Sequence, residues 1–148
     1  MTTVRDILGQ KMTPVWSVGA QDTVLDALAM LEKKDVGALL VENALGRAVG
    51  IVSERDYARK VELKDRKAGE VLVQDIMTPL NEVFGVRPET TIEECMVLIS
   101  ERKVRHLPVF SGSRVIGLVS IGDVLKLTIE EKEEEIEHLN RYIAGGYV

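Results

Sequence analysis

Apolar residues gather in four short runs of strand length, two in each half of the chain. Residues 36–41 (Val-Gly-Ala-Leu-Leu-Val) and 48–52 make the first pair. Residues 104–110 and 114–120 make the second pair, joined by the turn Ser111-Gly112-Ser113. The two runs of the first pair are continuously apolar, which indicates strands that are buried on both faces. The pattern therefore predicts one pair of adjacent strands in each half.

Apolar residues at helical spacing lie around these strands. The 3.6-residue period predicts a lead-in helix within residues 1–11 and a second helix that begins at Asp22. In the second half, Thr90-Thr91-Ile92-Glu93 predicts a capping box at the start of the corresponding helix. The other predicted elements are turns at residues 12–15 and 75–79, strands at 15–18 and 82–86, a helix at 54–63, a polar connector at 64–69 and a helix from Asp123 to Gly145-Gly146.

The two halves of the chain repeat one another. Five apolar positions of the first half recur 68 residues later in the second half. The loop that follows them is one residue shorter in the second half, so three motif positions after it recur at a separation of 67 residues. The pairs are Val18/Val86, Val24/Ile92, Met30/Leu98, Val36/Val104 and Val41/Val109, followed by Gly50/Gly117, Ser53/Ser120 and Asp56/Asp123. Agreement at this many positions indicates an internal duplication.

Each copy follows the order strand, helix, strand, strand, helix. A local hairpin combined with a helical crossover is typical of an α/β or α+β unit, and we expect two small sheets that face each other through their helices. A unit of about 65 residues buries too little surface to be secure alone, so the copies are expected to share a core. The predicted division is a first repeat with its lead-in helix at 1–66, a second repeat at 67–130 and a C-terminal helical extension at 131–148.

Composition narrows the class of protein. The chain has 148 residues, of which 45% are hydrophobic and 29% charged, as in a globular protein. Its net charge of −5 argues against general attraction to nucleic acid or to an anionic membrane. The sequence shows neither an apolar signal core nor an apolar run of membrane-spanning length. Because a single cysteine excludes an intramolecular disulfide, a reducing cytoplasm is the predicted compartment.

A short motif ends the last strand of each copy. Residues 50–56 (Gly-Ile-Val-Ser-Glu-Arg-Asp) recur as residues 117–123 (Gly-Leu-Val-Ser-Ile-Gly-Asp), each leading into Ser-x-x-Asp at the head of a helix. Ser-x-x-Asp is a variant of the capping box, worth roughly 1 kcal/mol without any ligand. An ionised Asp at this place can also accept both hydroxyl protons of a ribose diol. Duplication copies caps as well as sites, so the motif alone leaves both interpretations open.

The duplicated motif, together with the apolar strand before it at residues 36–41 and 104–109, resembles the tandem CBS-domain family. This family is named for cystathionine beta-synthase, and its domain pair is called the Bateman module. The resemblance covers residues 5–130. In finer detail the chain is similar to stand-alone bacterial CBS-pair proteins and to plant organellar CBS-pair proteins proposed to modulate thioredoxins. The segments that carry this second likeness are 53–61, 104–109, 120–123 and 139–147.

The resemblance implies two repeats related by a pseudo-twofold axis, with clefts that hold an adenosine ligand such as AMP, ADP, ATP, NAD or S-adenosylmethionine. It places the Ser and Asp of each motif at the ribose, apolar strand residues around the adenine, and Arg105 with His106 at a phosphate. It also implies a homodimer, because two such pairs usually assemble into a flat disc. The implied nucleotide-binding residues are Ser53, Arg55, Asp56, Val36, Ala38, Val104, Arg105, His106, Leu118, Ser120 and Asp123.

Two further features bear on function. Gly37 and Ala38 stand where the second copy has Arg105 and His106, so we expect the two clefts to be non-equivalent. The last helix has a highly charged middle and an apolar stripe, which either covers its own domain or packs on a second chain. The stripe consists of Leu125, Ile129, Ile136, Leu139 and Ile143.

The remaining residues give no case for an enzyme or a metal site. The sequence has no Gly-rich phosphate loop, nucleophile elbow or metal-ligand spacing, and Cys95 lies on an inward helix face, as expected of an unreactive core thiol. The predicted function is a non-catalytic regulatory module that acts in trans on a partner, with a thioredoxin-like protein as one candidate. Two alternatives stay open: a structural or interaction dimer with degenerate clefts, and a cryptic enzyme that acts on a nucleotide.

Overall fold

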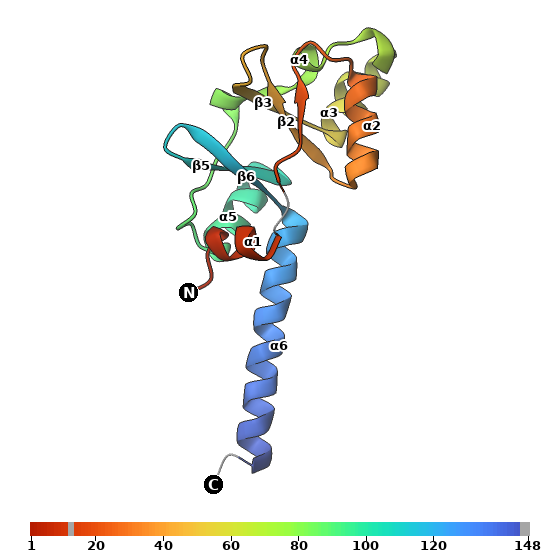
Figure 1. Ribbon diagram of the computed structural model, residues 1–148. Helices are drawn as coiled ribbons and strands as arrows, with labels where there is room; N and C mark the ends of the chain where they lie inside the picture. Colours follow the sequence, from red (N-terminus) through yellow and green to blue (C-terminus); the bar gives the residue numbers. More distant parts are fainter. Residues whose placement is uncertain (12–13, 146–148) are drawn as a thin grey trace.

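A computed structural model describes residues 1–11 and 14–145, and its elements form two units stacked end to end (Figure 1). The turn predicted at residues 12–15 and the end of the predicted C-terminal extension lie partly outside these residues. Unit 1 contains β1 (Ser17–Gly19), α2 (Val24–Lys34), β2 (Ala38–Glu42), β3 (Ala48–Ser53) and α3 (Glu54–Lys60). Unit 2 contains α5 (Ile92–Arg102), β5 (His106–Ser111), β6 (Arg114–Ser120) and α6 (Ile121–Gly145). The other elements are α1 (Val4–Lys11), the 3₁₀ turns η1 (Glu62–Lys64), η2 (Ala68–Glu70) and η3 (Leu80–Glu82), the short helix α4 (Val73–Ile76) and β4 (Thr78–Pro79).

The two sheets differ in extent. Unit 1 has a four-stranded sheet in the order β1-β2-β3-β4, in which β1 runs parallel to β2 and the other pairs are antiparallel. Unit 2 has the β5–β6 hairpin, with Val86 forming one parallel bridge to Val109. The strand predicted at 82–86 is therefore wrong except for this bridge. Leu80–Glu82 is a 3₁₀ turn, and Pro88, which has no N–H group, follows close behind.

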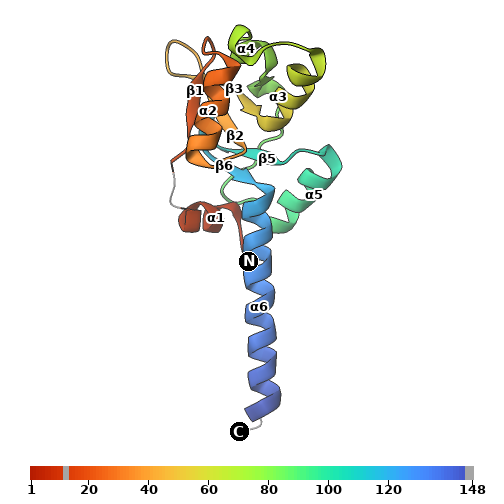
Figure 2. The same ribbon diagram turned by 90° about the vertical axis from the view of Figure 1, so that its right-hand side faces the viewer.

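The lead-in segment of each repeat packs on the other unit. Backbone N–H of Val4 donates to Thr90 O at 2.8 Å, and its counterpart Val73 donates to Asp22 O at 2.8 Å. Helix α1 is thereby held on unit 2, while α4 is held on unit 1 (Figures 1 and 2). Helix α1 precedes the first repeat in the sequence, but in the structure it packs on the second repeat.

The apolar cores reflect this exchange. Val4 and Ile7 of α1 are buried in the core of unit 2, and Val73 and Ile76 of α4 are buried in the core of unit 1. A lead-in helix of this length is marginal alone, and its apolar face is buried only by the other repeat. Neither core is complete without a segment from the other half of the duplication.

The two units meet through their sheets, and not through their helices as expected. A third apolar cluster joins Ala38, Leu40 and Ile51 of the first sheet to Val115 and Leu118 of the second hairpin. The strands are apolar on both faces, so one face packs on the helices of its own unit while the other packs on the partner sheet. The helices consequently lie on the outside.

Both predicted helix caps lie one residue further along than expected. The N-caps are Thr23 and Thr91, and each forms a full capping box with the acid three residues later. Asp22 instead accepts a hydrogen bond from Gly19 N at 2.8 Å, and Thr90 accepts one from Arg87 N at 3.0 Å. The polar residue before each cap closes the preceding turn, because an Asx- or ST-type side chain can serve either role.

Helix α6 runs for 25 residues and leaves the body of the molecule (Figure 2). Val124 and Leu127 are buried against unit 2, whereas every residue from 132 to 144 is exposed. The division predicted at 130/131 falls inside this continuous helix, and the domain boundaries remain a prediction. In the described part of the chain, no helix is both long and apolar enough to cross a membrane.

The exchange of lead-in helices makes a prediction for unfolding. Ile7→Ala and Ile76→Ala should each cost about 2–5 kcal/mol, because both side chains are almost fully buried. Amide hydrogen exchange should rise mainly in β5 and β6 for Ile7→Ala, and mainly in β2 and β3 for Ile76→Ala. Leu45→Ala, at a position that is 79% exposed, serves as the neutral control. Faster exchange in the unit of the same repeat would contradict the exchange of lead-in helices.

Candidate functional site

Two clefts lie across the boundary between the units. The basic cleft has a volume of 660 Å³ and lies between Ser53–Asp56 of unit 1 and Val104–His106 of unit 2. The Lys11 cleft has a volume of 340 Å³ and lies between Ser120–Asp123 of unit 2 and Val36–Ala38 of unit 1. Each cleft therefore combines the motif of one repeat with the strand start of the other.

All eleven residues implied by the resemblance line one of these clefts. Leu118 joins the Lys11 cleft, and His106 lines both clefts. The structure thus brings the residues together as two sets, one around each motif. Their part in nucleotide binding stays a prediction.

Both Ser-x-x-Asp motifs cap helices. Asp56 Oδ2 accepts from Ser53 N at 2.9 Å, and Ser53 Oγ accepts from Asp56 N at 3.3 Å. In the second copy Asp123 Oδ2 accepts from Ser120 N at 2.8 Å, and Ser120 Oγ accepts from Asp123 N at 3.1 Å. The capping interpretation is therefore confirmed. It fixes the two carboxylates in the lining of the clefts.

A lysine is bound to each motif carboxylate, and sequence reasoning identified neither lysine. Lys60 Nζ lies 3.1 Å from Asp56 Oδ1 and also donates to Ile76 O at 2.8 Å. Lys11 Nζ lies 2.9 Å from Asp123 Oδ2 and donates to Leu118 O at 2.9 Å. Lys60 stands four residues after Asp56, a spacing that predicts an ion pair on a helix. Lys11 is too distant in sequence for any such signal.

The environment of Asp123 favours its charged form. Burial on its own raises the pKa of this carboxyl, but hydrogen bonds from Ser120 and Lys11 and the charge of Lys11 together hold the pKa below its usual value of 3.8. Asp123 is therefore a fixed anion whose charge is already balanced by Lys11. A ligand hydroxyl would have to compete with that ammonium group.

His106 separates the two clefts and favours its neutral form. Burial lowers the pKa of its imidazole below 6.5, Lys11 and Arg105 lower it further, and Asp123 and Asp56 oppose the shift only in part. On the other side, a Cβ atom added to Gly37 would lie 3.1 Å from His106 Nε2. A side chain at residue 37 would therefore require the imidazole to shift slightly.

The clefts differ in charge. The basic cleft is lined by six basic and three acidic side chains, whereas the Lys11 cleft has one basic and two acidic. In the basic cleft the cations are Arg55, Arg59, Lys60, Arg102, Lys103 and Arg105, and the acids are Glu54, Asp56 and Glu82. The non-equivalence expected from the sequence is confirmed, and it favours an anionic ligand in the basic cleft.

An aromatic side chain borders each cleft beneath a cation. The Arg102 guanidinium lies 4.4 Å from the centre of the Phe84 ring, and Lys34 Nζ lies 3.9 Å from the centre of the Trp16 ring. Such cation–π contacts hold the ring face in a defined orientation. In both repeats this position of the sequence faces a cleft.

Other chemistry is not supported by the described residues. Within ranges 1–11 and 14–145, no group of three or more His, Cys, Asp or Glu side chains is placed to hold a metal ion. Cys95 is fully buried, and burial together with Glu94 raises the pKa of its thiol to about 11. The expectation of an unreactive core thiol is confirmed.

Comparison with known proteins gives the family. The family model of the CBS domain matches residues 4–63 and again residues 73–130. The chain belongs to the CBS-domain family. The resemblance seen in the sequence is thereby confirmed, and the two units are tandem CBS repeats related by a pseudo-twofold axis.

Stand-alone CBS-pair proteins are among the relatives. CBS domain-containing protein CBSX3, mitochondrial, of Arabidopsis thaliana is 38% identical over 156 aligned positions, covering 99% of this chain and 74% of the relative. The crystal structure of the CBS domain NE2398 is 41% identical with a TM-score of 0.79, covering 86% and 98% of the two chains. CBSX2, solved in complex with AMP, is 30% identical with a TM-score of 0.68, covering 89% and 99%.

The half-buried imidazole of His106 makes stability depend on pH. Because the folded-state pKa of His106 is lowered, the unfolded chain binds the proton more readily, and stability falls as the pH drops below about 6.5. His106→Gln should lose less stability than the wild type between pH 7.5 and pH 5.5 in urea unfolding. The control His138→Gln, on the exposed part of α6, should behave like the wild type. Equal losses in wild type and His106→Gln would contradict the assignment.

Proposed function

We propose that this chain is a non-catalytic regulatory module that binds an adenosine nucleotide in the basic cleft and so modulates a partner protein in trans. The observation that carries the proposal is the composition of that cleft. A cavity of 660 Å³, within the usual range for small ligands, combines the motif carboxylate, an excess of basic side chains and an apolar wall. These are the groups that a ribose, a phosphate and an adenine require.

The ribose is assigned to Asp56. Its Oδ1 atom faces Lys60 Nζ at 3.1 Å, while Oδ2 serves the cap. A vicinal diol can donate to Oδ1 without disrupting the cap, and Lys60 is then available to a phosphate oxygen. Cap and ligand contact use different oxygens of one carboxylate, so the capping role does not exclude the binding role.

The phosphate is assigned to the cations at the unit boundary. Arg105 and Arg59 line the cleft from opposite units, and a guanidinium pairs well with phosphate oxygens. Arg55 is already committed, since its Nη1 donates to Lys103 O at 2.6 Å, so it contributes mainly charge. His106, neutral at pH 7, contributes a hydrogen bond and not a charge. The adenine is left to the apolar wall of Ile51, Val83 and Phe84.

A relative supports this choice of ligand. CBSX2, which is 30% identical to this chain, was solved in complex with AMP. AMP, ADP, ATP and NAD all carry the adenosine phosphate that the basic cleft suits. The Lys11 cleft is smaller and carries one more acidic than basic side chain, so it suits a phosphate poorly.

Regulation follows if the ligand prefers one arrangement of the two units. The basic cleft takes its walls from both repeats, so a bound nucleotide would bridge them and bias their relative angle or rigidity. The proposed action is in trans, as a homodimer, on a partner such as a thioredoxin-like protein in the cytoplasm. One relative is mitochondrial by name, so the cytoplasmic location is proposed together with the function.

The helix caps also support an alternative function, a structural or interaction dimer with degenerate clefts. Both motifs form complete caps with a lysine on the carboxylate, and neither needs a ligand to satisfy its polar groups. A structural or interaction dimer with degenerate clefts would look the same. Ligand binding separates the two functions.

A thermal-shift titration with AMP, ADP, ATP and NAD tests the proposal. A ligand at 100 times its dissociation constant adds about 2.7 kcal/mol, which raises the melting temperature by several degrees. Asp56→Asn should abolish this shift. Asp123→Asn is the matched control, because it alters the equivalent cap by the same change and should retain the shift.

Two results would contradict the proposal. If no nucleotide shifts the wild type at millimolar concentration, the degenerate-cleft alternative holds. If Asp123→Asn loses the shift and Asp56→Asn keeps it, the ligand lies in the Lys11 cleft.

A further inference from the structure

Lys11, the last residue of α1, extends its ammonium group to the second motif. Its Nζ atom lies 2.9 Å from Asp123 Oδ2 and donates to Leu118 O at 2.9 Å. Only 31% of the Lys11 side chain and 23% of the Asp123 side chain are exposed, so salt screens this ion pair less than a surface pair. One ammonium group thus binds two residues that line the Lys11 cleft.

The carbonyl group of Leu118 is open to Lys11 because β6 is an edge strand. In the described part of unit 2 the sheet has two strands, and Leu118 faces Pro108 of β5, which has no N–H group to donate. In unit 1 the corresponding residue, Ile51, is covered by Thr78 of β4. Lys11 therefore takes the place at the second sheet that β4 holds at the first.

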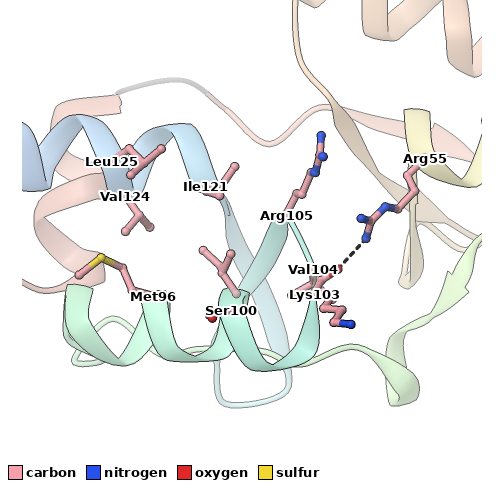
Figure 3. A pocket seen from close by; sticks show the side chains of 10 residues that line it. Arg55, Met96, Ser100, Lys103, Val104, Arg105, Ile121, Val124 and Leu125 are labelled. Atoms are coloured by element: carbon pink, nitrogen blue, oxygen red, sulfur yellow. Dashed lines mark hydrogen bonds between the residues drawn. The ribbon is translucent and has the colours of Figure 1, made fainter.

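The first motif is bound in a different way. Lys60 pairs with Asp56 from the same helix, and its second acceptor is the carbonyl oxygen of Ile76, a residue in the core of unit 1. At this motif the cation that crosses the unit boundary is Arg55, whose Nη1 donates to Lys103 O at 2.6 Å (Figure 3). The carboxylate of the first motif is thus bound by its own helix, whereas the second is bound by a separate helix.

The rest of the Lys11 cleft suits an uncharged nucleoside. Trp16 of unit 1 and Ile116 of unit 2 line it, so a flat base can pack between apolar surfaces from both units. Apart from Lys11, its charged side chains are the carboxylates of Asp35 and Asp123. Carboxylates accept hydrogen bonds from sugar hydroxyl groups and repel phosphate groups.

We propose that Lys11 is a built-in occupant of this cleft and excludes a nucleoside from the second motif. Its ammonium group holds the Asp123 carboxylate that a ribose diol would use as acceptor, and its side chain lines the cleft that the nucleoside would enter. The duplication therefore retains both motifs but leaves one of them open to a ligand. The inference concerns the cleft to which the proposed function assigns no ligand, so it does not depend on AMP binding in the basic cleft.

Adenosine binding, measured by isothermal titration calorimetry, tests the proposal. The full chain carrying Asp56→Asn, which disables the basic cleft, is compared with the same chain carrying Lys11→Ala as well. Lys11→Ala should tighten adenosine binding at least about tenfold, with one adenosine per chain, because a hydrogen bond to a charged group is worth roughly 10- to 100-fold in affinity. An unchanged affinity for adenosine would overturn the proposal.

Three further variants in the Asp56→Asn chain serve as controls, and circular dichroism shows whether each is folded. Arg5→Ala removes a cation of α1 that pairs with the exposed Glu89, and it should leave adenosine binding weak. Lys11→Arg keeps a cation at the cleft and should do the same. Lys11→Met removes the ammonium group but keeps an apolar side chain, so it should show the gain even if Lys11→Ala does not fold. A gain with Arg5→Ala would attribute the effect to net charge and overturn the proposal.

Asp123 locates the gained binding. Adding Asp123→Asn to the chain with Asp56→Asn and Lys11→Ala should abolish the gain, because the amide that replaces the carboxylate carries no charge. If the gain survives this change, adenosine lies elsewhere and the proposal is wrong.

AMP binding separates this inference from the proposed function. Lys11→Ala alone should still bind one AMP per chain, because the basic cleft is lined by other residues. If no variant binds AMP, the proposed function fails, while the adenosine titrations still decide the role of Lys11. If AMP binds and Lys11→Ala gains no adenosine, the inference about Lys11 fails alone.

Discussion

The reciprocal exchange of lead-in segments is the constraint on which the rest of the structure depends. Each repeat lends a short helix to the core of the other, through Val4 and Ile7 in one direction and Val73 and Ile76 in the other. Because each core is incomplete alone, the two repeats are held in one relative placement. Both clefts lie across that boundary, so the exchange also fixes the distance between each motif and the strand that faces it.

The two repeats differ in sequence at the wall that the two clefts share. His106 occupies the wall between them, and Gly37, its neighbour across the boundary, leaves the space that the imidazole needs. A larger residue 37 would press on the imidazole, so the glycine of one repeat and the histidine of the other are matched in size. The asymmetry in charge between the clefts has a separate source, the six basic side chains of the basic cleft, of which Arg105 stands where the first repeat has Gly37.

Local patterns carried most of the fold prediction. The duplication and the strand at residues 114–120 follow from residues that are close in sequence or 67–68 positions apart, whereas the residues around both clefts were named through the resemblance to the CBS-domain family. The exchanged helices, the contact between sheets and the ion pair of Lys11 with Asp123 did not follow, because they depend on which surfaces meet in space. The N-cap positions were missed by one residue, since Asp22 and Thr90 can also close a turn.

The central claim is that two copies of one motif now serve different purposes, with a nucleotide in the basic cleft alone. Isothermal titration calorimetry of the wild type with AMP, alongside adenosine, tests it most directly. The account predicts one AMP per chain and much weaker binding of adenosine, because the basic side chains act on the phosphate. Two AMP molecules per chain, or equal affinity for adenosine, would contradict it.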